Sequence, residues 1–133
     1  MFEDIFISFL KLSPEDSMTS PDIMRALIEF KNLSEGVIEK IYQHKRKFFF
    51  RIRTKKGRYF LLMEPAVRVN LTNINYEWEL TNFIMMIRKH LKGKKIISVR
   101  QYMFDRIVLM ELEDEYKVIC EVIRRGNFVV TRG

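Results

Sequence analysis

The sequence predicts an α+β domain made mainly of antiparallel strands, folded as a two-sheet sandwich or a partly open barrel. Strand-like runs rich in β-branched and aromatic residues fill most of the chain, and short turn segments separate them. Only two segments place their apolar residues at helical spacing. With 133 residues, of which 47% are hydrophobic and 13% aromatic, the chain is long and apolar enough to form one folded core.

The first helix is predicted over residues 20–33. Thr19 or Ser20 can cap its free backbone N–H groups, and Pro21 suits a first turn because it lacks an N–H group. Asp22 follows Thr19 by three residues, as in a capping box. The apolar residues of this segment recur at helical spacing and predict its buried face: Ile23, Ala26, Leu27 and Phe30.

A second helix is predicted over residues 80–91. It ends in a basic turn, and Gly93 behind it suits a left-handed cap. One apolar stripe is predicted on it: Leu80, Phe83, Ile84, Ile87 and Leu91.

Eight strands are predicted in two groups of four. The first group comprises residues 37–44, 47–54, 58–65 and 67–72. The second group comprises residues 96–102, 106–112, 116–123 and 128–131. The short links Lys45-Arg46 and Lys55-Lys56-Gly57 indicate hairpins within the first group.

The charge of the chain is uneven. A polar cluster ends an acidic stretch, so residues 1–17 are predicted to be an N-terminal extension and residues 18–133 the domain. The net charge of the whole chain is +7, and the domain alone carries 23 basic and 13 acidic residues, a net charge of +10. Such a basic domain favours an anionic partner, with nucleic acid ahead of a membrane. The chain shows no export signal and no apolar run long enough to span a bilayer, so we expect a cytoplasmic protein without a membrane partner.

No enzyme signature is present. His44 and His90 stand far apart, and Cys120 lies within an apolar run that predicts a buried position. We therefore expect no metal, no cofactor, no small-molecule substrate and no catalytic residue.

Two basic segments are the candidate binding residues. Residues 44–58 hold eight Lys or Arg residues and no acid, and residues 88–95 hold five. The alternation of residues 48–53 predicts Arg51 and Arg53 on an open face with Phe49 between them, where cations and an aromatic ring suit a nucleic acid. The alternative is a core strand with a solvated outer face. The predicted nucleic-acid-binding residues are Lys45, Arg46, Lys47, Arg51, Arg53, Lys55, Lys56, Arg88, Lys89, Lys92, Lys94 and Lys95.

Several stretches together resemble one known family. RKHLKGKKIISVRQYMFDRIVLMEL at 88–112, RRGNFVVT at 124–131, TSPDIMRALI at 19–28 and FLLMEPAVRVNLT at 60–72 look like the N-terminal domain of the NFACT family. That family includes the nuclear export mediator factors of eukaryotes and the fibronectin-binding protein A-like proteins of bacteria and archaea. Its members normally continue into further domains.

The resemblance implies a ribosome-associated quality-control factor. Such factors act on large ribosomal subunits blocked by peptidyl-tRNA and help to recruit tRNA for tailing of the stalled peptide, so tRNA and ribosomal RNA are the implied partners. The family's functional Asp-Arg pair corresponds to Asp105 and Arg106, and its early Asp corresponds to Asp22. The implied fold is that of the N-terminal domain of formamidopyrimidine-DNA glycosylases. Two alternatives stay open: a glycosylase-like enzyme domain and a fibronectin-binding adhesin fragment.

Overall fold

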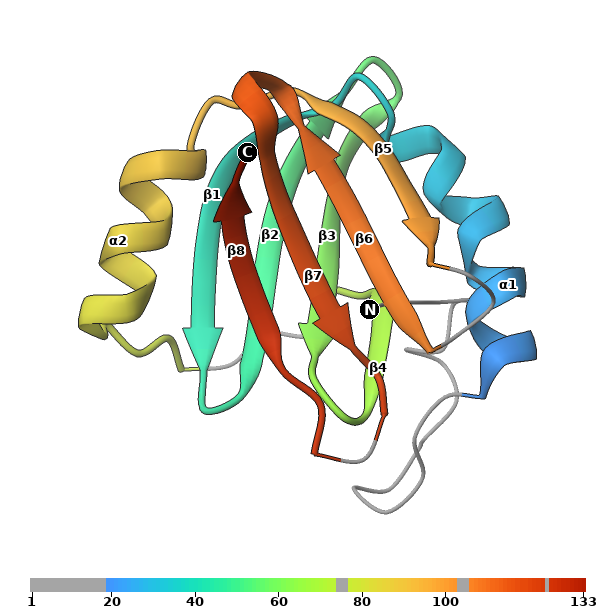
Figure 1. The fold of residues 1–133 in the computed structure, drawn as a ribbon. Helices are drawn as coiled ribbons and strands as arrows, with labels where there is room; N and C mark the ends of the chain where they lie inside the picture. The colour runs from blue at the N-terminus through green and yellow to red at the C-terminus, as the bar shows by residue number, and fades with distance from the viewer. Residues whose placement is uncertain (1–18, 74–76, 103–105, 124) are drawn as a thin grey trace.

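Two four-stranded antiparallel sheets face each other, with helices along their sides (Figure 1). The computed structural model describes residues 19–73, 77–102, 106–123 and 125–133. The predicted extension over residues 1–17 lies outside this part. The observed architecture is a mostly β sandwich and not a closed barrel, since the described strands form two separate ladders.

The first sheet has the order β1-β2-β3-β4 and the second has the order β5-β6-β7-β8. The strands of the first sheet are β1 (Val37–His44), β2 (Lys47–Thr54), β3 (Gly57–Glu64) and β4 (Arg68–Leu71). The strands of the second sheet are β5 (Ile96–Gln101), β6 (Ile107–Leu112), β7 (Tyr116–Glu121) and β8 (Phe128–Arg132). Each strand lies within a residue or two of its predicted range, because the alternation and the turn residues are local signals.

Helix α1 (Ser20–Phe30) packs beside β5, and the 3-10 helix η2 (Lys31–Leu33) continues it. Thr19 caps α1 with the predicted capping box: the Thr19 hydroxyl accepts from the Asp22 N–H at 3.3 Å, and the Asp22 carboxylate accepts from the Thr19 N–H at 2.9 Å. At its other end, the helix predicted over residues 20–33 is α-helical only as far as Phe30, because residues 31–33 form η2.

Helix α2 (Asn82–Leu91) packs beside β1. Its buried stripe is Ile84, Ile87 and Leu91. The assignment of Leu80 to that stripe is wrong, because Thr81 is the N-cap and Leu80, in front of it, is 69% exposed. Gly93 has φ +86°, the left-handed conformation predicted behind this helix. Within the described residues, no helix has the length and apolar character to cross a membrane.

One hydrophobic core fills the space between the sheets. Phe48 and Phe50 of β2 point into it, and Phe128 of β8 stacks on Phe48 with ring centroids 4.0 Å apart. Burial of such a side chain contributes roughly 1.5–3 kcal/mol. Cys120 of β7 is fully buried in the same core, as predicted.

The two sheets meet at one corner, where the beginnings of β1 and β5 come together. Val37 and Lys95 form an isolated antiparallel bridge there, and the Ile96 N–H donates to the Gly36 carbonyl at 2.7 Å. This corner brings the end of η2, the β2–β3 turn and the start of β5 close to one another.

Candidate nucleic-acid interface

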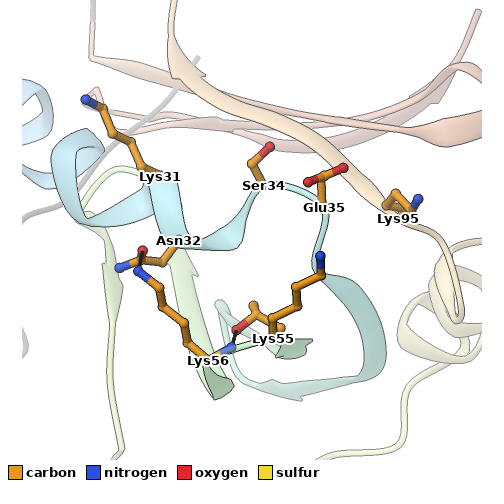
Figure 2. A pocket seen from close by; sticks show the side chains of 8 residues that line it. Lys31, Asn32, Ser34, Glu35, Lys55, Lys56 and Lys95 are labelled. Atoms are coloured by element: carbon orange, nitrogen blue, oxygen red, sulfur yellow. Dashed lines mark hydrogen bonds between the residues drawn. The ribbon is translucent and has the colours of Figure 1, made fainter.

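A basic pocket of about 430 Å³ opens at this corner (Figure 2). Its lining comes from three segments that are distant in sequence: Lys31, Asn32, Ser34, Glu35, Thr54, Lys55, Lys56 and Lys95. Four of these side chains are cationic and one is anionic. We call this site the lysine pocket. In Figure 2 the Lys55 side chain points toward Glu35, Lys56 points toward Asn32, and Lys31 extends away from the opening.

Hydrogen bonds from the link between η2 and β1 to strand β5 fix the backbone around the lysine pocket. The Glu35 N–H donates to the Ile96 carbonyl at 2.7 Å, and the Ser34 hydroxyl donates to the Ile97 carbonyl at 3.1 Å. Glu35 has φ +68°, so this link between η2 and β1 is a tight bend. The wall that carries Ser34 and Glu35 is therefore held directly against β5.

The β2–β3 turn forms the opposite wall. The Thr54 hydroxyl donates to the Gly57 carbonyl at 2.9 Å and accepts from the Lys56 N–H at 3.1 Å. The Lys56 ammonium donates to the Asn32 side-chain oxygen at 3.2 Å, which links the turn to η2. Lys55 and Lys56 are exposed at the tip of this turn.

A second basic group lies on the outer face of the first sheet. The Glu39 carboxylate accepts from the Arg58 Nε at 2.8 Å and lies 3.3 Å from the Nε of both Arg51 and Arg53. We call these four residues the arginine cluster. The hydrogen bond from Arg58 holds the pKa of Glu39 below its ordinary value, and the charges of Arg58, Arg51 and Arg53 act in the same direction. One carboxylate thus faces three guanidinium groups.

The prediction of an open face around Phe49 is wrong. Phe49 is 1% exposed, and the Trp78 ring lies edge-on to it with centroids 4.9 Å apart. Trp78 also stacks on Tyr42 at 4.7 Å. Phe49 is therefore covered by another aromatic ring and does not offer its own face to a base.

The remaining basic residues of the first segment lie at the other end of β2. The Arg46 guanidinium donates to the Gly126 carbonyl at 3.0 Å, and the Lys47 ammonium lies 3.5 Å from the Glu64 carboxylate. The Lys45 N–H donates to the Glu79 carboxylate at 3.0 Å. Since β2 has eight residues, the structure separates this group from the lysine pocket by the length of a strand.

The basic end of α2 is also divided. The Arg88 Nε donates to the Ile41 carbonyl at 2.6 Å, so this side chain ties α2 to β1. Lys94 forms an ion pair with Asp114, whose pKa it holds below the ordinary value by hydrogen bonding and charge. Lys89 and Lys92 are exposed. Only Lys95 of this segment lines the lysine pocket.

Of the three residues assigned through the family resemblance, the structure describes two, Asp22 and Arg106. Asp22 takes part in the cap of α1. Asp105 lies outside the described residues. Arg106 directly precedes β6, and its carbonyl accepts from the Val122 N–H at 2.6 Å, which pins the backbone there.

Sequence reasoning missed Lys31 and Glu39 as parts of these sites, and it placed Arg58 in the basic segment 44–58 without naming it as a binding residue. Lys31 lies near the end of the helix predicted over residues 20–33, and only the fold brings it near Lys55 and Lys95. In the described part of the chain, no three His, Cys, Asp or Glu side chains gather in a way that could hold a metal ion.

These observations define a basic two-sheet domain with two cationic surface regions. The chain belongs to the family described as NFACT N-terminal and middle domains, whose model matches residues 20–133.

Relatives with curated names agree with this assignment. The chain is 31% identical over 119 residues to the human ribosome quality control complex subunit NEMF, covering 83% of this chain and 11% of that protein. It is 28% identical over 127 residues to the archaeal Rqc2 homolog aRqcH of Methanocaldococcus jannaschii, covering 86% of this chain and 19% of that protein. The chain therefore spans a fifth or less of the length of these relatives.

The fold is also similar to a solved structure. The N-terminal domain of the fibronectin-binding protein PavA from Streptococcus pneumoniae matches with a TM-score of 0.82 and 25% identity. The match covers 88% of this chain and 52% of the solved chain.

Proposed function

We propose that this chain is an RNA- and ribosome-binding module of a ribosome-associated quality-control factor. The observation that carries the proposal is the 31% identity to a human protein named as a subunit of the ribosome quality control complex. The role that we assign to the chain is binding, without catalysis of its own. Its partners are tRNA, ribosomal RNA and the large ribosomal subunit in the cytoplasm.

The charge of the chain supports an RNA partner. Lysine and arginine side chains attract phosphates and release their condensed counterions, which supplies affinity that does not depend on sequence. In this molecule the lysine pocket and the arginine cluster place such side chains in and beside the same hairpin turn.

Asp105, Arg106 and Asp22 are assigned to the engagement of tRNA and to tailing. Substituting Asp105→Ala or Arg106→Ala should change the free energy of unfolding by no more than about 1 kcal/mol, as is typical of surface sites. Both substitutions should weaken tRNA binding when the domain is placed in a full-length relative. Asp22→Ala should also cost about 1 kcal/mol, because it removes part of the cap of α1. Early melting of the Asp105 and Arg106 variants with normal tRNA binding would reduce the pair to a structural turn.

The direct experiment is co-sedimentation of the chain with purified ribosomal subunits. The proposal expects the chain to pellet with large subunits in preference to small ones, and to be released as salt is raised. Equal recovery with both subunits, or with neither, would contradict it.

A second candidate function is binding of fibronectin, which the name of the PavA protein favours. Immobilised fibronectin should retain the chain if this candidate is correct. We expect no retention at a salt concentration that preserves binding to large subunits.

We further propose that the fold is related to the N-terminal domain of formamidopyrimidine-DNA glycosylases but lacks their chemistry. Incubation with damaged duplex DNA tests this point. Cleavage of the strand or trapping of a covalent imine would overturn the non-enzymatic assignment.

A further inference from the structure

The lysine pocket has a composition that suits one class of ligand. Its four cationic residues are all lysines, and none of its lining residues is aromatic. Lysine acts as a compact point charge on a flexible stem, whereas the planar donor fork of arginine favours fixed two-point contacts. Without an aromatic ring the pocket offers no platform on which a base can stack. These features favour phosphate groups over bases.

The pocket combines a fixed frame with adaptable charges. Its walls are tied by the hydrogen bonds from Glu35 to Ile96 and within the Thr54 turn. Lys55 and Lys56 stand at an exposed turn tip, where the Lys55 ammonium can follow an incoming strand and the Lys56 ammonium can exchange its hydrogen bond to Asn32 for one to a phosphate. The volume of about 430 Å³ lies within the roughly 300–1,000 Å³ range of known ligand sites.

The neighbouring charges extend this site along the hairpin. Arg53 pairs with Arg58 across β2 and β3, immediately before the turn that carries Lys55 and Lys56. Arg53 and Arg58 therefore continue the line of cations from the pocket onto the face of the sheet, where the Glu39 carboxylate offsets part of their charge. A linear polyanion can follow this track, whereas a single small anion needs only the pocket.

We propose that the lysine pocket binds backbone phosphates of an RNA strand without reading its base sequence. This inference rests on the proposed function and names the surface that meets the RNA. Lys55, Lys56 and Lys95 contact phosphate, Lys31 contributes from the rim, and Glu35 lowers the net charge of the site. The carboxylate of Glu35 thus limits the affinity of the pocket for anions.

The test is the salt dependence of binding to a short, fluorescently labelled oligouridine, measured by anisotropy on the 133-residue chain. For a single strand, log affinity falls with log salt by roughly 0.7 per neutralised phosphate. Each neutralised phosphate therefore makes the affinity fall about fivefold for a tenfold rise in salt. The double variant Lys55→Gln/Lys56→Gln should lower the slope by roughly 0.7 for each phosphate that the chain no longer neutralises. Glu35→Gln should raise the affinity.

Lys117→Gln is the control for loss of a positive charge outside the pocket, because Lys117 lies on β7 and donates to the Gly133 carbonyl at 3.3 Å. Its slope should stay close to the wild-type value. Melting temperatures of all variants identify any that fail to fold, and Lys95→Gln replaces such a variant. Oligouridine and oligoadenosine of equal length should bind with similar affinity.

The outcomes separate this inference from the proposed function. If the wild-type chain binds oligouridine but the pocket variants and Lys117→Gln share its slope, the pocket inference is overturned and RNA binding stands. If pyrophosphate displaces oligouridine fully at the same phosphate concentration, the pocket is a site for free phosphates and not for a strand. If the wild-type chain binds no RNA, both the pocket inference and the proposed function are overturned.

Discussion

The lysine pocket includes the β2–β3 turn and the arginine cluster lies directly beside that turn, yet their charges are used differently. In the arginine cluster, the Glu39 carboxylate lies within 3.3 Å of three guanidinium nitrogens. In the lysine pocket, Glu35 is the one acid among the lining residues, and four lysines surround it. Cations that are close in sequence can therefore have different roles. The arginines of the cluster pair with a carboxylate of the same chain, whereas the lysines of the pocket remain available for a partner.

The largest loss of stability that we expect comes from a substitution at Gly36, in the backbone beside the lysine pocket. Gly36 is buried, and a Cβ atom placed there would lie 2.7 Å from the Ile52 Cγ2 atom and 2.9 Å from the Leu33 carbonyl oxygen. Gly36→Ala should therefore destabilise the chain by about 1–3 kcal/mol, the usual cost of overpacking. It should also weaken RNA binding, because the pocket wall must shift.

Chemical denaturation of this variant gives the free energy of unfolding. The matched control is Gly93→Ala, because a Cβ atom there meets nothing within 4 Å and only the positive φ of +86° opposes it. That strain should cost about 1–2 kcal/mol and leave RNA binding intact. If both variants bind RNA normally, the corner between the sheets does not shape the pocket.

The next largest effect is a difference in melting temperature between the Glu39→Gln and Glu35→Gln variants. Glu39→Gln removes the charge that the three arginines share and leaves them to repel one another, so the melting temperature should fall by a few degrees. Glu35→Gln has the same change of charge, but it removes the acid from a pocket rather than from a set of close ion pairs, and its melting temperature should stay near the wild-type value. Thermal unfolding followed by circular dichroism measures both. Equal melting temperatures would show that Glu39 does not stabilise the fold.

The pH dependence of stability should report the ionisation of the Glu39 carboxylate. The folded-state pKa of Glu39 lies below its ordinary value of 4.5, so the unfolded chain binds this proton more readily than the folded chain. Its contribution to stability is therefore full above about pH 4.5 and is lost as the pH falls through the lowered pKa. The difference in melting temperature between wild type and Glu39→Gln should shrink on acidification. A difference that is constant down to the acid limit would contradict the lowered pKa.

The smallest effect should come from Arg51 and Arg53. From the sequence alone, replacing both with Gln is predicted to flatten the salt dependence of RNA binding. Because the structure places both beside Glu39, we expect the slope to change by less than the roughly 0.7 of one neutralised phosphate. The Lys55→Gln/Lys56→Gln variant, with the same change in charge, is the comparison. A larger change for the arginine pair would make the cluster the main RNA contact.

The strands could be predicted from the sequence because their signals are local. Phe48, Phe50 and Ile52 alternate along β2 and face the core, as their spacing predicts. The capping box of Thr19 and Asp22 and the left-handed Gly93 could be predicted for the same reason. Each depends on residues close together in the chain.

The division of the cations into these two regions could not be predicted, because it depends on contacts between distant segments. The register of β1 shifts between Ile38 and Lys40, and an even alternation does not predict this bulge beside Glu39. The lysine pocket exists only because the start of β1 meets the start of β5. Composition shows how many cations a segment holds, whereas the fold decides which of them already have a carboxylate.

The most direct test of the account is the reactivity of lysine amines on the chain bound to large ribosomal subunits. Labelling with an amine-reactive reagent, read by mass spectrometry, compares the free and the bound chain residue by residue. Lys40, whose ammonium lies 5.4 Å from the Tyr42 ring, reports on the face of the arginine cluster, and Lys117 reports on the second sheet. The account predicts that Lys55, Lys56 and Lys95 lose reactivity on binding while Lys117 keeps it and Lys40 changes less. Protection of Lys117 or Lys40 with unchanged labelling of the three pocket lysines would contradict it.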